Sequence, residues 1–272
     1  MKWLHILLIA GTSCIFFACA NSDQSANDGG TGITSNVQQL SYSVAATYPH
    51  DTSSFTQGLE FYNGKLLEST GNLGKSKLMQ VDMATGNAVT SKPLSAELFG
   101  EGLTVLNDTL YQLTWQNRKV LVYDAKSLQP IKELPLNTDG WGIANDGQNL
   151  IVTDGSSNLY FYEPGTFRLL RTQGVTMDET PIGNLNELEF INGFLYANIW
   201  QTPYIVKIDP SSGQVLARLD FSDLVQRVKT KIPQYDTGNE ATLNGIAYDS
   251  TTRKIYITGK YWPELYEVQF EH

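Results

Sequence analysis

Histidine and cysteine are scarce in this chain of 272 residues, which contains three histidines and two cysteines. The histidines are His5, His50 and His272, too few and too far apart to build a histidine-rich zinc centre or a Ser-His-Asp triad. Cys14 and Cys19 both precede residue 20, so the rest of the chain has no disulfide and no cysteine nucleophile. We therefore expect a site with no metal and no cofactor, and leave open a structural cation in the channel or in a blade turn.

Long apolar runs are also rare, and the clearest one lies at the N-terminus. The uncharged, mostly apolar stretch 3–18 follows Lys2 and is too short for an ordinary membrane-spanning helix. It ends in a small residue before Cys19, which resembles a bacterial lipoprotein signal, although Phe16 stands where an aliphatic residue is usual. We expect a signal peptide over residues 1–19 with Cys19 as the lipidation site, and simple cleavage and secretion is the alternative.

The rest of the chain divides into a polar segment and one folded domain. Residues 20–38 are small and polar, which predicts a flexible tether. Residues 39–272 are numerous enough for one substantial core. We therefore expect a protein exported to the bacterial cell envelope and anchored through Cys19, on the periplasmic or the outer-surface side.

Basic residues are outnumbered, with 19 Lys and Arg against 28 Asp and Glu and a net charge of −9. This balance argues against a nucleic-acid partner and against electrostatic attraction to anionic lipids. Contact with a membrane is therefore expected through the lipid anchor alone.

The chain repeats one sequence pattern five times, a short apolar run that in most repeats is followed by a tight turn. The runs begin at Gly58, Gly102, Gly142, Glu187 and Gly245, at intervals of 44, 40, 45 and 58 residues. Turns such as Asn63-Gly64 and Asn192-Gly193 are strong hairpin signals, because both residues accept a positive φ. Repeats of this length that are built from hairpins favour a β-propeller.

Further strands complete each unit. Second strands are expected at 65–70, 109–114, 149–153, 194–199 and 254–258, and third strands at 78–81, 120–123, 159–162, 205–208 and 265–268. A fourth strand follows in the first four units, but the fifth unit stops after its third, so we expect an N-terminal strand over 39–44 to close the ring. The sequence thus predicts an all-β, five-bladed β-propeller of four-stranded antiparallel blades. A β-sandwich is the alternative, and a closed ring, which needs no partner chain, is expected to be a monomer.

One insert, 222–244, accounts for the longest interval. Its first residues, 222–228, predict a short capped helix. We interpret the insert as a lid or rim loop over one face of the propeller.

Propeller geometry brings two sets of residues to one mouth of the central channel, those just before each inner strand and those just after each second strand. Two phenylalanines that lie three residues before an apolar run are expected to join them. The full set is Phe55, Gln57, Phe99, Glu101, Trp115, Trp141, Asn186, Trp200, Asn244 and Lys260. Apolar walls would raise the pKa of Glu101 toward neutrality and suit it to acid–base work, and Lys260 could stabilise an oxyanion. A structural carboxylate, a solvated lysine, turn-capping amides and core tryptophans remain the alternatives.

Eight short motifs carry a more specific signal. They begin at Phe55, Phe99, Gln112, Gly140, Leu185, Ala197, Leu243 and Thr258, and include Phe-Gly-Glu-Gly-Leu-Thr at 99–104 and Leu-Asn-Glu-Leu-Glu at 185–189. In this order they resemble the glutaminyl-peptide cyclotransferases of plant and bacterial type, over residues 41–270. The resemblance implies a five-bladed propeller, unrelated to the zinc-dependent animal enzymes of the same activity.

The resemblance also implies a reaction, the cyclisation of N-terminal glutamine in peptides or proteins to pyroglutamate with release of ammonia. Position by position, the acid–base glutamate of the family falls on Glu101, with Lys260 and Asn186 as the other expected catalytic residues. Substrate-binding positions fall on Phe55, Gln57, Phe99, Trp115, Trp141 and Trp200. Asn244 is expected to be structural.

Two other functions are compatible with such a mouth. A non-catalytic propeller lipoprotein could bind a ligand or partner there, but it would not need Glu101, Lys260 and Asn186 together. A propeller lactonase usually needs a metal cage of several carboxylates and amides, and we expect Glu101 to be the only acid of the channel ring.

Overall fold

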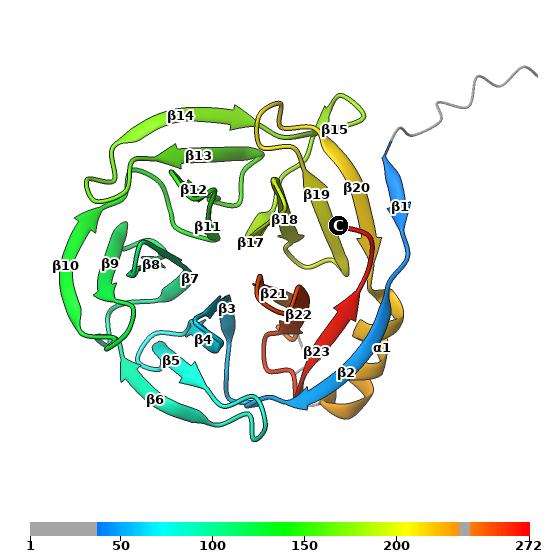
Figure 1. Cartoon of the computed structure of the whole chain (residues 1–272), viewed down its shortest axis with the longest axis horizontal. Helices are drawn as coiled ribbons and strands as arrows, with labels where there is room; N and C mark the ends of the chain where they lie inside the picture. Colours follow the sequence, from blue (N-terminus) through cyan, green and yellow to red (C-terminus); the bar gives the residue numbers. More distant parts are fainter. Residues whose placement is uncertain (1–36, 234–239) are drawn as a thin grey trace, which may run out of the picture. The chain divides into compact units, whose positions relative to one another are not determined.

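The computed structural model describes residues 37–233 and 240–272. Within these ranges, five small antiparallel sheets surround a central axis as the blades of a propeller (Figure 1). This arrangement confirms the predicted all-β, five-bladed fold and excludes the sandwich. Cys19, the predicted signal peptide and residues 20–36 of the predicted tether lie outside the described residues.

Each blade runs from an inner strand at the axis to an outer strand at the rim. Blade 1 consists of β3 (Thr56–Tyr62), β4 (Lys65–Thr70), β5 (Lys77–Val81) and β6 (Ala88–Pro93). Blade 2 consists of β7 (Gly100–Leu106), β8 (Thr109–Thr114), β9 (Lys119–Asp124) and β10 (Pro130–Pro135). Blade 3 consists of β11 (Ile143–Asn145), β12 (Leu150–Val152), β13 (Asn158–Tyr162) and β14 (Leu169–Gly174). Blade 4 consists of β17 (Leu185–Ile191), β18 (Phe194–Ile199), β19 (Tyr204–Ile208) and β20 (Val215–Asp220), preceded by the hairpin β15 (Thr176–Met177) and β16 (Thr180–Pro181). Blade 5 consists of β21 (Leu243–Asp249), β22 (Lys254–Gly259), β23 (Glu264–Gln269) and β2 (Ser43–Pro49).

The inner hairpins form where the turn chemistry predicts them. Asn63 and Gly64 have φ values of 51° and 73°, and Asn192 and Gly193 have φ values of 50° and 91°. These left-handed conformations match the right-handed twist of the flanking strands, which is why asparagine and glycine occur there. The same two-residue turn therefore sets the spacing from inner to second strand in blades 1 and 4.

The ring is closed by two N-terminal strands rather than one. β2 pairs antiparallel with β23 and completes blade 5, whereas β1 (Gln38–Leu40) pairs in parallel with β20 of blade 4 (Figure 1). The predicted N-terminal closure is confirmed, but its location at 39–44 is wrong. The pairing breaks at Tyr42, whose ring packs 4.2 Å from that of Phe221 between the two blades, and the closing strand begins only after it.

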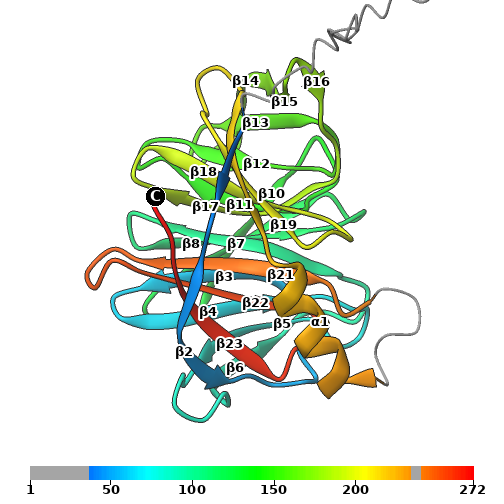
Figure 2. The same ribbon diagram turned by 90° about the vertical axis from the view of Figure 1, so that its right-hand side faces the viewer.

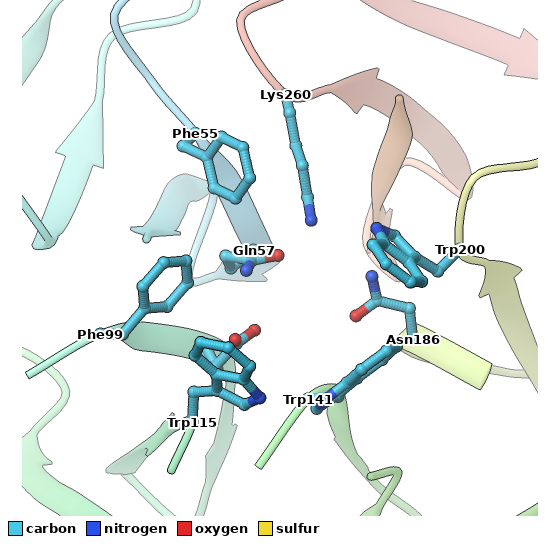
Figure 3. A pocket seen from close by; sticks show the side chains of 9 residues that line it. Phe55, Gln57, Phe99, Trp115, Trp141, Asn186, Trp200 and Lys260 are labelled. Atoms are coloured by element: carbon cyan, nitrogen blue, oxygen red, sulfur yellow. The ribbon is translucent and has the colours of Figure 1, made fainter. Parts of the chain in front are cut away.

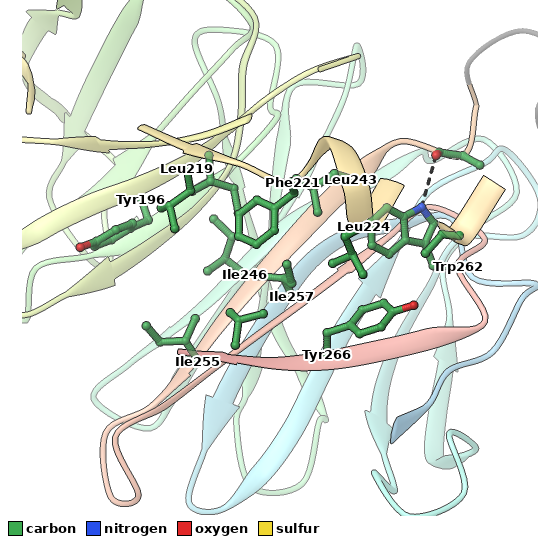
Figure 4. Close-up of a cluster of buried hydrophobic side chains, with 14 of the residues drawn as sticks. Tyr196, Leu219, Phe221, Leu224, Leu243, Ile246, Ile255, Ile257, Trp262 and Tyr266 are labelled. Carbon is green, nitrogen blue, oxygen red and sulfur yellow. Dashed lines mark hydrogen bonds between the residues drawn. The ribbon is translucent and has the colours of Figure 1, made fainter. Parts of the chain in front are cut away.

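The insert after blade 4 does not act as a lid over the described part of its length. Its helix α1 (Ser222–Lys231) is longer than predicted, and Phe221 occupies the N-cap position without a side-chain cap. Leu224 and Val228 are buried in a cluster with Trp262, whose indole Nε1 donates to the Ala241 carbonyl at 3.2 Å (Figure 4).

Figure 2, which views the ring from its side, shows α1 beside β2 and β23 on the outside of the ring. The described part of the insert, 222–233, therefore lies at the rim of the ring and not over the channel as a lid, while residues 234–239 lie outside the description. No helix in the described ranges is long and apolar enough to cross a membrane.

Candidate active site

A cavity of about 270 Å³ opens at one mouth of the channel (Figure 3). It is lined by Phe55, Gln57, Phe99, Glu101, Trp115, Trp141, Asn186, Trp200 and Lys260. These are the nine catalytic and substrate-binding residues expected from the sequence, and they come from all five blades. The volume lies just below the usual range for small-molecule sites, about 300–1,000 Å³, so the cavity suits one amino-acid side chain better than a long peptide.

The polar side chains reach the cavity because the inner strands are irregular at that end. In β3, β7, β17 and β21 the pairing with the second strand shifts register between Thr56 and Gly58, Gly100 and Leu103, Leu185 and Leu188, and Leu243 and Ile246. Gln57, Glu101, Asn186 and Asn244 lie in these four interruptions. A β-bulge leaves its extra residue unpaired and re-aims its side chain, so the same device places a polar group near the axis in four blades.

Glycines next to these positions let neighbouring inner strands approach to backbone contact. A Cβ on Gly142 would lie 2.0 Å from the Asn186 carbonyl oxygen, and one on Gly102 would lie 2.8 Å from Ile143 N. Gly102 N also donates to the Trp141 carbonyl at 2.8 Å. The glycines are therefore needed to bring the polar residues of adjacent blades into one small ring.

Backbone hydrogen bonds hold the ends of the second strands beside the starts of the inner strands. Trp115 N donates to the Phe99 carbonyl at 3.1 Å, and Lys260 N donates to the Thr242 carbonyl at 2.9 Å. Trp200 N donates similarly to Asn184 O, at 2.8 Å. This pairing is why residues 16 to 18 positions apart share one mouth.

The cavity walls are two aromatic groups on opposite sides. Figure 3 shows Phe55, Phe99 and Trp115 on one side and Trp141 and Trp200 on the other. Edge-to-face contacts order them, with ring centroids 6.0 Å apart for Phe55 and Phe99, 5.6 Å for Phe99 and Trp115, and 5.5 Å for Trp141 and Trp200. Trp115 is 37% exposed and forms the open rim.

Glu101 and Lys260 supply the charge of the cavity. Both side chains belong to residues that are only 4% exposed. Burial raises the pKa of Glu101 well above its ordinary value, and the positive charge of Lys260 opposes this shift. Burial likewise lowers the pKa of Lys260 to about 8, against the attraction of Glu101. The Lys260 ammonium lies 4.5 Å from the centroid of the Phe55 ring, in a cation–π contact.

The Glu101 carboxylate is free to meet a ligand. Within the described residues it accepts no hydrogen bond and forms no ion pair, whereas the backbone around it is fixed. Ser69 Oγ donates to the Glu101 carbonyl, and Gln112 Nε2 donates to Ser69 Oγ at 2.7 Å. The sequence did not predict that Ser69 and Gln112 hold the backbone of Glu101. The only sequence feature that pointed to them was the motif that contains Gln112.

The channel below the cavity is acidic, and here the sequence prediction was wrong. Glu187 accepts hydrogen bonds from Leu59 N at 3.2 Å and Ile246 N at 2.8 Å, so a side chain of blade 4 reaches blades 1 and 5 across the channel. Burial raises the pKa of Glu187, Glu189 and Glu60, the last to about 7. Glu101 is therefore not the only acid of the channel, although the described residues contain no group of three or more His, Cys, Asp or Glu placed to hold a metal ion.

Comparison with known proteins agrees with the cavity. The family model for glutamine cyclotransferase matches residues 12–270. Glutaminyl-peptide cyclotransferase of Arabidopsis thaliana is 34% identical over 272 residues, which cover 98% of this chain and 82% of that protein. The crystal structure of Myxococcus xanthus glutaminyl cyclase superposes with a TM-score of 0.81 at 34% identity, covering 86% of this chain and 98% of that one. The chain belongs to the glutamine cyclotransferase family.

Proposed function

We propose that this enzyme converts the N-terminal glutamine of peptides or proteins to pyroglutamate and releases ammonia. The observation that carries the proposal is the Glu101 carboxylate, which has no hydrogen-bond partner among the described residues and shares a small aromatic cavity with Lys260. The cavity takes about one side chain, and the reaction needs only one, because an N-terminal glutamine attacks itself.

A single carboxylate can carry out both proton transfers of the reaction. The α-amine attacks the γ-carboxamide carbon, a C–N bond forms, and the amine gives one proton to Glu101. The tetrahedral intermediate then expels the amide nitrogen, which takes that proton from Glu101 and leaves as ammonia. Glu101 ends as it began, and burial raises its pKa well above the ordinary value, which makes the carboxylate a better acceptor for the amine proton.

The other polar groups act on charge and position. During attack, negative charge develops on the carboxamide oxygen, where the Lys260 ammonium and the amide groups of Gln57 and Asn186 can stabilise it. The aromatic walls hold the side chain folded back toward its amine, and this alignment removes much of the entropic barrier to ring closure.

A direct assay tests the proposal. The protein is incubated with a Gln-initiated peptide, and ammonia release and the loss of one NH₃ from the peptide mass are followed against spontaneous cyclisation. The same peptide with an acetylated α-amine is the matched control, since it cannot attack. A rate equal to the spontaneous one would contradict the proposal, and binding without turnover would favour a non-catalytic binding protein. A chelator is expected to leave the rate unchanged.

We also infer that the chain is exported and lipid-anchored through Cys19, as its N-terminal sequence suggests. A Cys19→Ser variant is then expected to appear in the soluble fraction of fractionated cells, and an unchanged membrane-bound fraction would contradict the anchor.

A monomeric domain is expected in solution, because first and last strands pair within one chain. Light scattering on the tether-free domain measures this directly.

A further inference from the structure

Asn244 occupies, in blade 5, the position that carries Gln57, Glu101 and Asn186 in three other blades, yet it does not line the cavity. It is fully buried. Its Nδ2 donates to the Thr56 carbonyl at 3.0 Å and to Gln57 Oε1 at 3.3 Å. Asn244, which does not line the cavity, therefore forms a hydrogen bond with Gln57, which does.

The two hydrogen bonds determine which side of each carboxamide carries the NH₂ group and which carries the oxygen. A carboxamide can turn over, exchanging its oxygen and its NH₂ group at almost no steric cost, so only its partners decide which way it faces. The Thr56 carbonyl can only accept, which requires the NH₂ group of Asn244 on that side. That NH₂ group in turn requires an oxygen from Gln57, and it leaves Gln57 Nε2 without a partner among the described residues, at the wall of the cavity.

We propose that Asn244 is a positioning residue, which holds the Gln57 carboxamide so that it offers the substrate N–H donors and not its oxygen. This assignment rests on the proposed function, in which a donor is needed where negative charge develops on the carboxamide oxygen of the substrate. A carbonyl oxygen in the same place would repel that charge.

The bonding of Asn244 also argues against a purely packing role. Its Oδ1 is buried without a partner in the described structure, which is unfavourable for folding. An apolar residue of similar size would avoid this cost. Asn198, close by, also buries one polar atom without a partner in the described structure, its Nδ2, but its Oδ1 accepts from Gly245 N at 3.0 Å and it forms no hydrogen bond to a cavity-lining side chain.

A double-mutant cycle tests the assignment. Asn244→Ala is expected to lower kcat about 10-fold with a smaller change in KM, because Gln57 can then turn over. In a Gln57→Ala background the same substitution is expected to lower kcat no further. Asn244→Asp, whose oxygens demand donors, should turn Gln57 over permanently and lower kcat about 100-fold, the order observed when one oxyanion donor is removed.

Controls separate positioning from folding. Asn198→Ala truncates a neighbouring buried asparagine and is expected to change kcat by the same factor in both backgrounds, and Tm is measured for every variant. An Asn244→Ala loss that is equally large in the Gln57→Ala background, or that follows the folded fraction, would overturn the assignment. Turnover by the wild-type protein, measured in parallel, tests the proposed function separately.

Discussion

Glu101 and Lys260 enter one cavity from blades 2 and 5, and each shifts the pKa of the other without forming an ion pair within the described structure. Burial disfavours both charges, and their mutual attraction restores part of each. Because neither group is held in direct contact with the other, both can turn to a bound glutamine. In the proposed mechanism the pair provides one proton carrier and one cation, both on residues that are almost fully buried.

Replacing Glu101 by glutamine tests the proton carrier. Glu101→Gln keeps the shape of the side chain but cannot accept the amine proton, so we expect kcat to fall about 10²–10⁴-fold with KM near the wild-type value. Steady-state kinetics on a Gln-initiated peptide measure both constants. Glu97→Gln, four residues away and exposed, is the control and should behave as wild type. Turnover by Glu101→Gln within a few-fold of wild type would remove the acid–base role.

Lys260 should shape the pH profile of kcat/KM. Glu101 must be ionised to act as a base, and the positive charge of Lys260 lowers its pKa. Lys260→Gln removes that charge, so the acid limb of the profile should move to higher pH and activity at neutral pH should fall about 100-fold.

The alkaline limb of the kcat/KM profile tests the charge of Lys260 itself. Since the pKa of Lys260 is lowered to about 8, the wild-type enzyme should lose this cation as the pH rises through that value. Lys260→Arg stays charged and should hold its activity to higher pH. Identical acid limbs in wild type and Lys260→Gln would show that the two groups are not coupled.

The aromatic wall leaves no room beside Gly71. A Cβ there would lie 2.3 Å from the ring of Phe99 and 3.1 Å from that of Phe55. Gly71→Ala should displace both rings and raise KM about 10-fold, with a smaller effect on kcat. Gly174→Ala is the control, since a Cβ at that position meets nothing within 4 Å. Equal KM values for the two variants would argue that the wall does not bind substrate.

The acids below the cavity predict how stability varies with pH. Burial raises the pKa of Glu60 to about 7, so its contribution to stability is complete below its unfolded-state pKa and is lost as pH rises through 7. Glu187 and Glu189 shift in the same direction. Wild-type Tm should therefore fall between pH 5 and pH 8.

Glu60→Gln should lessen this fall and raise Tm at pH 8 by about 3 °C, for a domain in which 1 kcal/mol corresponds to about 2–4 °C. At pH 5 no gain is expected. Glu271→Gln, an exposed position, should leave the pH dependence unchanged. A Tm gain for Glu60→Gln that is the same at both pH values would contradict a titrating Glu60.

Hairpins were predictable because each depends on residues close together in the sequence. The second strands expected at 65–70, 109–114 and 194–199 coincide with β4, β8 and β18. The N-terminal closure was located less well, because its partners β20 and β23 are remote in the sequence. Nothing in the local pattern marks Tyr42 as the point where the chain passes from blade 4 to blade 5.

The nine cavity residues were predictable because symmetry relates their positions. The role of Glu187 was not, since strand alternation would send it away from the side of Asn186. The shift of register in β17 brings both residues to the channel, and such a shift is visible only in the paired strands. The support of Glu101 by Ser69 and Gln112 was missed for a related reason, because the Ser69 side chain of blade 1 bonds the main-chain carbonyl of Glu101 in blade 2, remote in the sequence.

The pairing of β2 with β23 has a consequence for biosynthesis. A ribosome completes β21, β22 and β23 long after β2 has emerged, so blade 5 remains incomplete until all four strands have been made. Gln57 and Lys260 meet only when that blade is in place, and no earlier fragment of the chain holds the whole cavity. A fragment of the chain that stops before Lys260 therefore lacks part of the cavity lining, and we expect it to leave N-terminal glutamines untouched.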